Sequence, residues 1–381
     1  MNSIYSKLPH VGTTIFAIMS KLANDHKAIN LSQGFPDFNC PDKLIGLVNN
    51  YMKKGYNQYA PMQGVIALRE RISEKIEQLY GVSYHPETEI TITSGATEAI
   101  YDVITAVVKQ NDEVIIFEPA YDCYVPSIEL NGGKPVFVQL HAPDYHIEWD
   151  EVEKAISDKT VLMVINTPQN PTGAVLSAED INRLSAIVDG TNILILSDEV
   201  YEHIIFDQLK HQSMMINPIL KERSFVVFSF GKTYHNTGWK MGYCVAPQYL
   251  TKEFRKIHQF VTFTSNTPVQ YALADFMEDK DHYLALPDFY QQKRDKFCSL
   301  LAGSGFELLP CKGTYFQLAS YKNINSEQDT VFAETLTKQI GVASIPISVF
   351  YNDKTDNQVL RFCFAKEEKT LERAAEKLCG V

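Results

Sequence analysis

FVVFSFGKTYHNTGWKMGY, residues 225–243, is the segment of this chain that is most informative about its fold. It begins with a continuous apolar run and turns polar around Lys232. An apolar run without alternation predicts a strand that is covered on both faces, as in a largely parallel sheet. Lys232 is then expected just beyond the carboxyl end of a strand, at the edge where open α/β sheets bind ligands.

Similar β-rich runs recur on both sides of this stretch, among them VIIF, VLMVI and ILIL. The predicted strands are Glu89–Thr93, Glu113–Phe117, Pro135–Leu140, Val161–Asn166, Ile193–Ser197, Phe225–Phe230 and Gly242–Ala246. Helical patterns lie between them at Thr97–Gln110 and Ser177–Val188. This alternation predicts a layered α/β domain with right-handed crossovers.

The flanking segments have helical and strand patterns of their own. Helices are predicted over Gly64–Tyr80, Lys252–Met277, Asp288–Leu301 and Thr370–Leu378, and strands over Tyr315–Leu318 and Val359–Phe364. We expect a large domain over residues 45–280 and a smaller domain over residues 281–381, which the N-terminal segment 1–44 joins.

Composition limits the classes of partner. The 381 residues are 45% hydrophobic, and the formal net charge is −11 without a long basic run, so nucleic acid and anionic membranes are not expected partners. The seven cysteines include no C-x-x-C pair, which indicates free thiols in a reducing compartment. Residues 1–22 lack the apolar core of a signal peptide, and no apolar stretch approaches a membrane span. We expect a soluble, cytoplasmic protein without a bound metal ion.

Lys232 and Lys240 are the first candidates for chemistry. A lysine becomes a nucleophile when burial or a neighbouring cation lowers its pKa, and Lys240 can supply such a charge and also bind a phosphate. A surface lysine in a loop is the plain alternative. A penicillin-binding S-x-x-K motif also fits the letters, but the companion S-D-N and K-T-G motifs are absent.

Three more motifs follow predicted strands. In SDEVY (residues 197–201), Asp198 can pair with a protonated ring nitrogen and Tyr201 with a phenolic oxygen, although a helix N-cap is the simpler interpretation. NTPQNPTG (166–173) can fix the amide of Asn170, or can be only a proline-rich turn. SGATE (94–98) places Gly95 where free backbone N–H groups form a phosphate cradle, although a capping box uses the same letters.

Along the chain the four motifs follow successive strands in the order SGATE, NTPQNPTG, SDEVY and SFGK. This series resembles the fold-type I, class I/II aminotransferases that depend on pyridoxal 5'-phosphate. The resemblance runs from about Asn30 to Lys366. It is strongest for the branch with kynurenine, glutamine and methionine aminotransferases, because of LSQGFPDF (31–38), NQYAPMQG (57–64), EPAYDCY (118–124) and LRFCFAK (360–366). It implies a mixed, mostly parallel seven-stranded sheet between helices and a smaller α+β domain.

The resemblance also implies roles for single residues around the cofactor. Lys232 would hold pyridoxal phosphate as a Schiff base, Asp198 would face the ring nitrogen, and Tyr201 and Asn170 would donate to the ring oxygen. Tyr121 would stack on the ring, where many relatives have phenylalanine or tryptophan. The phosphate would be bound by Gly95, Ala96, Thr97, Ser229 and Lys240, the last replacing a common arginine.

Further roles concern the substrate and a second subunit. Arg361 would clamp the substrate carboxylate with help from Asn170 and the Gly34 backbone. Tyr59 would reach the phosphate in the neighbouring subunit, so the implied unit is a homodimer. Phe16 and Phe263 would favour apolar, sulfur-containing or aromatic side chains, with ordinary core packing as the alternative.

The resemblance therefore predicts ping-pong transfer of an amino group from methionine, and from aromatic amino acids, to a 2-oxo acid. One alternative is a kynurenine or glutamine aminotransferase with β-lyase activity on cysteine S-conjugates. A second is a regulatory protein that only senses the cofactor. The acidic net charge and the few residues before Asn30 disfavour that second alternative.

Overall fold

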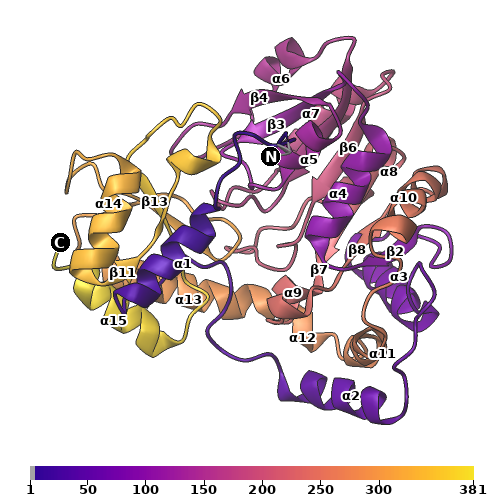
Figure 1. Cartoon of the computed structure of the whole chain (residues 1–381), viewed down its shortest axis with the longest axis horizontal. Helices are drawn as coiled ribbons and strands as arrows, with labels where there is room; N and C mark the ends of the chain where they lie inside the picture. The colour runs from indigo at the N-terminus through magenta and orange to yellow at the C-terminus, as the bar shows by residue number, and fades with distance from the viewer. Residues whose placement is uncertain (1–4) are drawn as a thin grey trace.

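The computed structural model describes residues 5–381, and its centre is one seven-stranded sheet (Figure 1). The strands are β2 (Ile90–Thr93), β3 (Glu113–Glu118), β4 (Lys134–Gln139), β5 (Thr160–Asn166), β6 (Leu194–Asp198), β7 (Ser224–Ser229) and β8 (Gly242–Val245). Their order across the sheet is β2-β8-β7-β6-β5-β3-β4. All of the predicted strands in this part of the chain are present within a few residues.

The sheet is parallel except at β8, which runs antiparallel to both β2 and β7. Successive side chains of β5 point to opposite faces, so that Val164 packs on one side and Ile165 on the other. Helices α4 (Ala96–Val107) and α10 (Gln248–Val261) cover the Val164 face, and α7 (Ala178–Val188) packs on the Ile165 face. The buried apolar runs are explained by this double cover, and the predicted α/β class is confirmed.

The other helices in the described part of the chain follow the sequence patterns to different degrees. They are α1 (Ile15–Asp25), α2 (Asp42–Lys53), α3 (Ile66–Tyr80), α5 (Tyr124–Leu130), α6 (Trp149–Ala155), α8 (Pro218–Lys221), α9 (Phe230–Thr233), α11 (Thr267–Phe276), α12 (Asp281–Leu284), α13 (Leu286–Leu301), α14 (Asp329–Thr335) and α15 (Glu368–Leu378). Shorter helical turns are η1 (Met214–Ile216), η2 (Thr237–Trp239), η3 (Leu336–Ile340) and η4 (Ser348–Phe350).

The single helix predicted over Lys252–Met277 is wrong, because the structure has two helices there, α10 and α11. The chain leaves the helical conformation at Phe263, whose φ is +69°. Asn266 then caps α11 by accepting a hydrogen bond from the backbone N–H of Val269, and Pro268 lies in the first turn of the new helix. Proline is favoured at that position and disrupts a helix interior, so Pro268 was the signal for the break.

The second part of the molecule combines the two ends of the chain (Figure 1). It has the four-stranded sheet β12 (Ile345–Pro346), β13 (Val359–Cys363), β10 (Phe316–Ser320) and β9 (Glu307–Leu308), and the pair β1 (Ile29–Asn30) and β11 (Val342–Ala343). β1 pairs with β11 in parallel, so the N-terminal segment is hydrogen-bonded to the C-terminal part. The predicted boundary after residue 44 falls inside α2, and the division into domains stays a prediction.

Within residues 5–381, no helix combines the length and the apolar character that a bilayer crossing requires. All seven cysteines carry free thiols, as the sequence predicts.

Candidate active site

A cavity of roughly 700 Å³ opens at the carboxyl ends of β5, β6 and β7. Parallel strands end at one edge of the sheet, so residues that are distant in the sequence meet there. The lining residues are Gly95, Ala96, Thr97, Ile100, Tyr121, Asn166, Asn170, Asp198, Val200, Tyr201, Ser229, Gly231, Lys232, Thr237, Lys240 and Met241. This set includes every residue predicted to hold the cofactor except Tyr59.

Lys232 lies in α9, the short helix that follows β7 directly. Its Nζ donates hydrogen bonds to the carbonyl oxygen of Gly34 at 3.0 Å and to the hydroxyl of Tyr315 at 2.9 Å. Burial lowers the pKa of Lys232 to about 8, and the positive charges of Arg361 and Lys240 act in the same direction. About a tenth of the amine is therefore neutral and nucleophilic at pH 7, far more than at the usual lysine pKa.

Asp198 ends β6 and is 4% exposed. Its Oδ2 accepts a hydrogen bond of 2.6 Å from the hydroxyl of Tyr124, and its Oδ1 accepts one from the N–H of Val200. Burial raises the pKa of Asp198 to about 6, and these hydrogen bonds oppose that rise. A buried carboxylate of this kind gains much from a cationic partner.

Backbone N–H groups at the start of α4 and the amine of Lys240 line another part of the cavity. Gly95 caps α4 with a φ of +86°, and the first N–H groups of that helix have no partner within it. The amine of Lys240 lies beside this turn, because a Cβ placed on Gly95 would be in contact with its Nζ at 3.5 Å. Ser229 and Gly242 pair across β7 and β8 beside it. Such a positive, N–H-rich turn fits a phosphate group.

Arg361 is fully buried on β13 and takes part in none of the ion pairs that residues 5–381 form. Its Nη1 donates to Oδ1 of Asn170 at 2.7 Å, and its Nη2 donates to the carbonyl oxygen of Ser32. The guanidinium carbon lies 3.9 Å from the centre of the Phe316 ring. A buried guanidinium with free donor capacity fits a carboxylate ligand.

The remaining predicted residues fall into two groups. Tyr201 is buried, and its ring centre lies 5.4 Å from Nζ of Lys232, while Phe16 lies 5.3 Å from the guanidinium of Arg361. Tyr59 and Phe263 are not at the cavity of this chain. Their rings contact each other at 5.5 Å on the surface, where they are 83% and 45% exposed.

The sequence analysis missed three residues that organise the site. Tyr315 binds both Lys232 and Gly34, and its hydroxyl donates to the Gly34 carbonyl oxygen at 2.6 Å. Tyr124 donates to Asp198, although it lies inside the quoted EPAYDCY string. Asn166 bonds the carbonyl oxygen of Asp198 through Nδ2, and its Oδ1 accepts from the N–H of Asn170. No spacing rule indicates Tyr315, which precedes β10 far along the chain.

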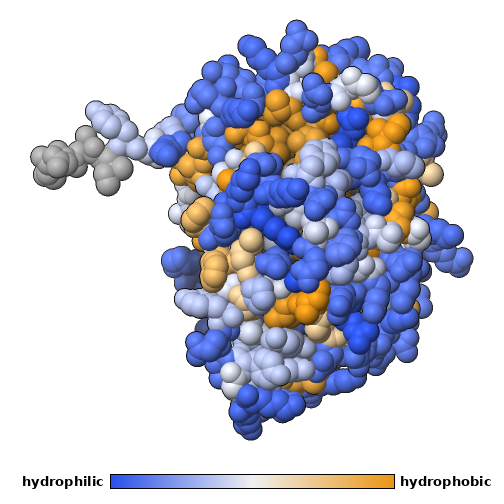
Figure 2. All heavy atoms as spheres, turned by 90° about the vertical axis from the view of Figure 1, so that its right-hand side faces the viewer, coloured by the Kyte–Doolittle hydropathy of each residue, from blue (hydrophilic) through white to orange (hydrophobic). Residues whose placement is uncertain are grey.

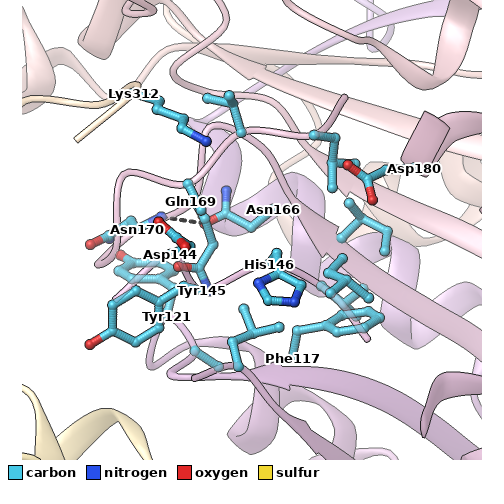
Figure 3. A pocket seen from close by; sticks show the side chains of 18 of the residues that line it. Phe117, Tyr121, Asp144, Tyr145, His146, Asn166, Gln169, Asn170, Asp180 and Lys312 are labelled. Atoms are coloured by element: carbon cyan, nitrogen blue, oxygen red, sulfur yellow. Dashed lines mark hydrogen bonds between the residues drawn. The ribbon is translucent and has the colours of Figure 1, made fainter. Parts of the chain in front are cut away.

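A second cavity, of roughly 730 Å³, lies beside the first and was not predicted (Figure 3). Tyr121, Asn166 and Asn170 line both cavities. Its walls are largely apolar, with Phe117 inside and the exposed Lys312 at its edge. The side chain of Tyr121 therefore lies between the two cavities and borders open space in both.

A mostly parallel seven-stranded sheet with a half-buried lysine after one strand and a buried carboxylate at the end of its neighbour defines an α/β enzyme of fold type I. The chain belongs to the aminotransferase class I and II family, whose sequence profile matches residues 26–378. The protein is therefore an aminotransferase.

The relatives agree in sequence and in structure. The chain is 50% identical to methionine aminotransferase of Escherichia coli strain K12, over 98% of this chain and 97% of that enzyme. It is 33% identical to kynurenine–oxoglutarate transaminase of Dictyostelium discoideum, over 96% of this chain and 94% of that protein. A crystal structure of an Escherichia coli protein with a methionine aminotransferase function has a TM-score of 0.98 at 49% identity, and both chains are covered completely.

Enzymes of this family use pyridoxal phosphate, and the residues of the first cavity fit that group. The N–H groups after Gly95 and the amine of Lys240 match a phosphate, and Asp198 matches a protonated ring nitrogen. The Lys232 amine matches an aldehyde. The cavity thus offers one matching group for the phosphate, one for the ring nitrogen and one for the aldehyde of the cofactor.

Proposed function

We propose that this aminotransferase moves the α-amino group of methionine, and of other apolar or aromatic amino acids, to a 2-oxo acid in two half-reactions. The observation that carries the proposal is the amine of Lys232, buried at the sheet edge beside Asp198 with its pKa lowered to about 8. The 50% identity to a methionine aminotransferase supports the choice of substrate.

Bound in the first cavity, pyridoxal phosphate would supply an aldehyde for the amino group and a protonated ring that accepts electrons from the substrate Cα. Gly95, Ala96, Thr97, Ser229 and Lys240 would hold its phosphate. Asp198 would keep the ring nitrogen protonated. Asn170 and Tyr201 would donate to the ring oxygen, and Tyr121 would cover the ring face.

Arg361 and Lys232 would then act on the substrate. Arg361 would bind the α-carboxylate with two parallel hydrogen bonds, with Asn170 and Gly34 beside it. This contact orients the substrate so that its Cα–H bond faces the Nζ of Lys232. Nζ would take the Cα proton as a general base and return it on the cofactor side, and the second half-reaction would reverse these transfers.

Selection of the side chain would fall to apolar residues near Arg361. Phe16 already packs against the Arg361 guanidinium, and a methionine sulfur gains about 0.3–1.5 kcal/mol against an aromatic ring. Phe263 would contribute only from a second subunit, because it is remote from the cavity of its own chain.

We further propose a homodimer in which Tyr59 completes the phosphate site of the partner. Tyr59 is 83% exposed in one chain, and its ring contacts the exposed ring of Phe263. A tyrosine that is exposed in the monomer and implied to bind phosphate fits a site shared between two copies. Replacing Tyr59 with phenylalanine should weaken cofactor retention while the Schiff-base lysine stays available.

A second candidate function is kynurenine or glutamine transamination with β-lyase activity on cysteine S-conjugates. It is supported by the 33% identity to a kynurenine–oxoglutarate transaminase. Release of pyruvate and ammonia from a cysteine S-conjugate, compared with 2-oxo acid formation from methionine, separates the two.

The deciding experiment is borohydride reduction of the holoenzyme followed by peptide mapping. The pyridoxyl group is expected on Lys232, and Lys232→Ala should lose both the label and turnover. A label on another lysine would overturn the assignment. A panel of amino donors with several 2-oxo acids then ranks methionine against kynurenine, glutamine and the aromatic amino acids.

A further inference from the structure

A buried imidazole lies directly behind the phosphate cradle. His258, on α10, is 0% exposed and contacts two segments that are far apart in the sequence. Its Nδ1 lies 2.6 Å from Oε1 of Glu98 on α4, and its Nε2 lies 3.0 Å from the carbonyl oxygen of Met62.

Both ring nitrogens of His258 face acceptors, so both must carry a hydrogen. Burial opposes this charge, but the neighbouring carboxyl groups of Asp102 and Glu98 outweigh it and raise the pKa of His258 to about 9. The side chain is therefore an imidazolium with one N–H directed at each segment. A metal ion bound by both His258 and Glu98, with bonds of about 2.0–2.1 Å, would hold the two ligand atoms farther apart than the 2.6 Å that separates Nδ1 from Oε1. The contact between these two side chains is therefore a hydrogen bond.

Asp102 lies one turn after Glu98 on α4 and completes the buried cluster. Its Oδ2 is 3.6 Å from Nδ1 of His258, and neither of its oxygens meets a hydrogen-bond donor among the described residues. Burial raises the pKa of Asp102 to about 7, and its ionised form places a negative charge beside the imidazolium.

Glu98 links the imidazole of His258 to the phosphate cradle through two hydrogen bonds. One of its oxygens bonds His258, and the other accepts a hydrogen bond from the backbone N–H of Ser94. Ser94 is the residue before Gly95, whose φ of +86° sets the turn into α4. The position of Glu98 therefore fixes the entrance of the turn that would bind phosphate.

Through Nε2, His258 contacts Met62, which belongs to the segment 57–64. The carbonyl of Gln58 in this segment accepts a hydrogen bond from Thr267, and the carbonyl of Gln63 accepts one from Ile92 in β2. The segment exposes Tyr59 at the surface, where the proposed homodimer would pair. Apolar areas are visible between polar ones on the face drawn in Figure 2.

We propose that His258 is a positioning residue that couples the phosphate cradle to the segment 57–64, so that cofactor binding and subunit pairing strengthen each other. This inference rests on the proposed cofactor and homodimer. The coupling is reciprocal, because two linked binding equilibria must change each other by the same factor.

Two substitutions separate the two contacts of the imidazole. The amide nitrogen in His258→Asn can take the place of Nδ1 and keep a donor for Glu98, but it cannot reach Met62. The longer His258→Gln can place its donor near Nε2, toward Met62, and leaves Glu98 without it. Each variant keeps one contact and breaks the chain between cradle and segment.

The test is the rate at which subunits exchange between two differently labelled pools, with and without saturating pyridoxal phosphate. In the wild type, the cofactor should slow exchange on the order of tenfold, a typical coupling factor. In His258→Asn and His258→Gln the ratio should fall below about twofold. Variants that fold but keep the wild-type ratio would overturn the proposal.

His211→Gln is the matched control, because His211 is also buried against a carboxylate, 2.8 Å from Glu199, but lies away from the cradle. It should keep the wild-type ratio, and an equal loss there would attribute the effect to general destabilisation. If either His258 variant does not fold, Glu98→Ala removes the contacts to His258 and to Ser94 and must lower the ratio. A wild-type protein that neither binds the cofactor nor pairs would refute the proposed function instead.

Discussion

Two cations with little or no access to solvent are the costliest residues of the site: Arg361 is fully buried and Lys232 is half-buried. Neither takes part in an ion pair within the described residues, and an unpaired buried charge is expensive. Lys232 reduces the cost by a lowered pKa, whereas an arginine cannot lose its proton at physiological pH. An anionic ligand would therefore stabilise Arg361, and the substrate carboxylate is such a ligand.

Replacing Arg361 with lysine should raise the KM for the amino donor by roughly tenfold to a hundredfold, because charged hydrogen bonds contribute about 1.5–3 kcal/mol and lysine cannot bind bidentately. Cofactor affinity should change little, since Arg361 does not line the cavity. Steady-state kinetics and a spectral titration with pyridoxal phosphate measure both. Arg294→Lys, which loses a two-bond pair with Asp207 elsewhere, is the control. An unchanged KM in Arg361→Lys would exclude the assigned role.

Tyr315→Phe should lower the pKa of Lys232 further. The Tyr315 hydroxyl accepts a hydrogen bond from Nζ and so favours the charged amine, and its removal favours the neutral form. From about 8 the pKa should fall by about one unit. The pH dependence of Lys232 labelling by an amine reagent, followed by mass spectrometry of the cofactor-free protein, measures this change.

Tyr290→Phe is the control for that experiment. Its ring lies 5.7 Å from that of Tyr315, but its buried hydroxyl has no hydrogen-bond partner among the described residues. The Lys232 profile should be unchanged there. The same profile in Tyr315→Phe as in the wild type would show that the hydroxyl does not stabilise the charged amine.

At the scale of elements, the strands of the large sheet were predictable because both of their faces are buried, which leaves continuous apolar runs. Helices with clear ends were predictable too, such as α3, which stops at Gly81 with a φ of +69°. Short helices such as α5 and α6 escaped prediction, because seven residues carry too little periodicity. The break before α11 was missed although Pro268 marks it.

The candidate site divides in the same way. Residues at strand ends, such as Asp198 and Lys232, were predictable because the sheet brings consecutive strand ends together. Tyr315 and His258 could not be predicted, since their partners come from segments about eighty or more residues away along the chain. Only packing of the whole chain creates those contacts.

Gly242 lies where β8 packs so closely against β7 and the start of α4 that a side chain would not fit. A Cβ there would lie 2.6 Å from the carbonyl oxygen of Phe228 and 2.9 Å from the nitrogen of Ala96. Gly242→Ala should therefore cost about 1–3 kcal/mol of unfolding free energy. It should also weaken cofactor binding, because Ala96 belongs to the cradle. Urea titration and cofactor titration measure the two effects.

Gly46→Ala is the opposite case and the control. Gly46 lies within α2, and a Cβ there meets nothing within 4 Å. Alanine should stabilise the protein by about 0.5–1 kcal/mol, because glycine loses more backbone entropy in a helix. If Gly242→Ala were as stable as the wild type, the close approach of β8 to the cradle would not be needed.

At the scale of the whole molecule, one chain leaves large apolar side chains on its surface. Tyr59 and Phe260 are 83% and 86% exposed, and the half-exposed ring of Phe263 contacts Tyr59. Residues 5–14 are almost entirely exposed and extend from the body of the molecule (Figure 2). Exposed aromatic side chains favour association, and two-fold pairing of identical chains is the commonest form.

Shared sites predict complementation between two defective subunits. Lys232→Ala lacks the nucleophile, and Tyr59→Ala lacks the group proposed to reach the partner's phosphate. In a heterodimer of the two, one site combines Lys232 of the second variant with Tyr59 of the first and is intact, while the other site has both defects. Heterodimers purified with two different affinity tags should therefore show about half of the wild-type turnover, because one of the two symmetric sites is restored. If each chain built its own site, the heterodimer would show only the mean of its two weak parents, and the shared-site arrangement would be wrong.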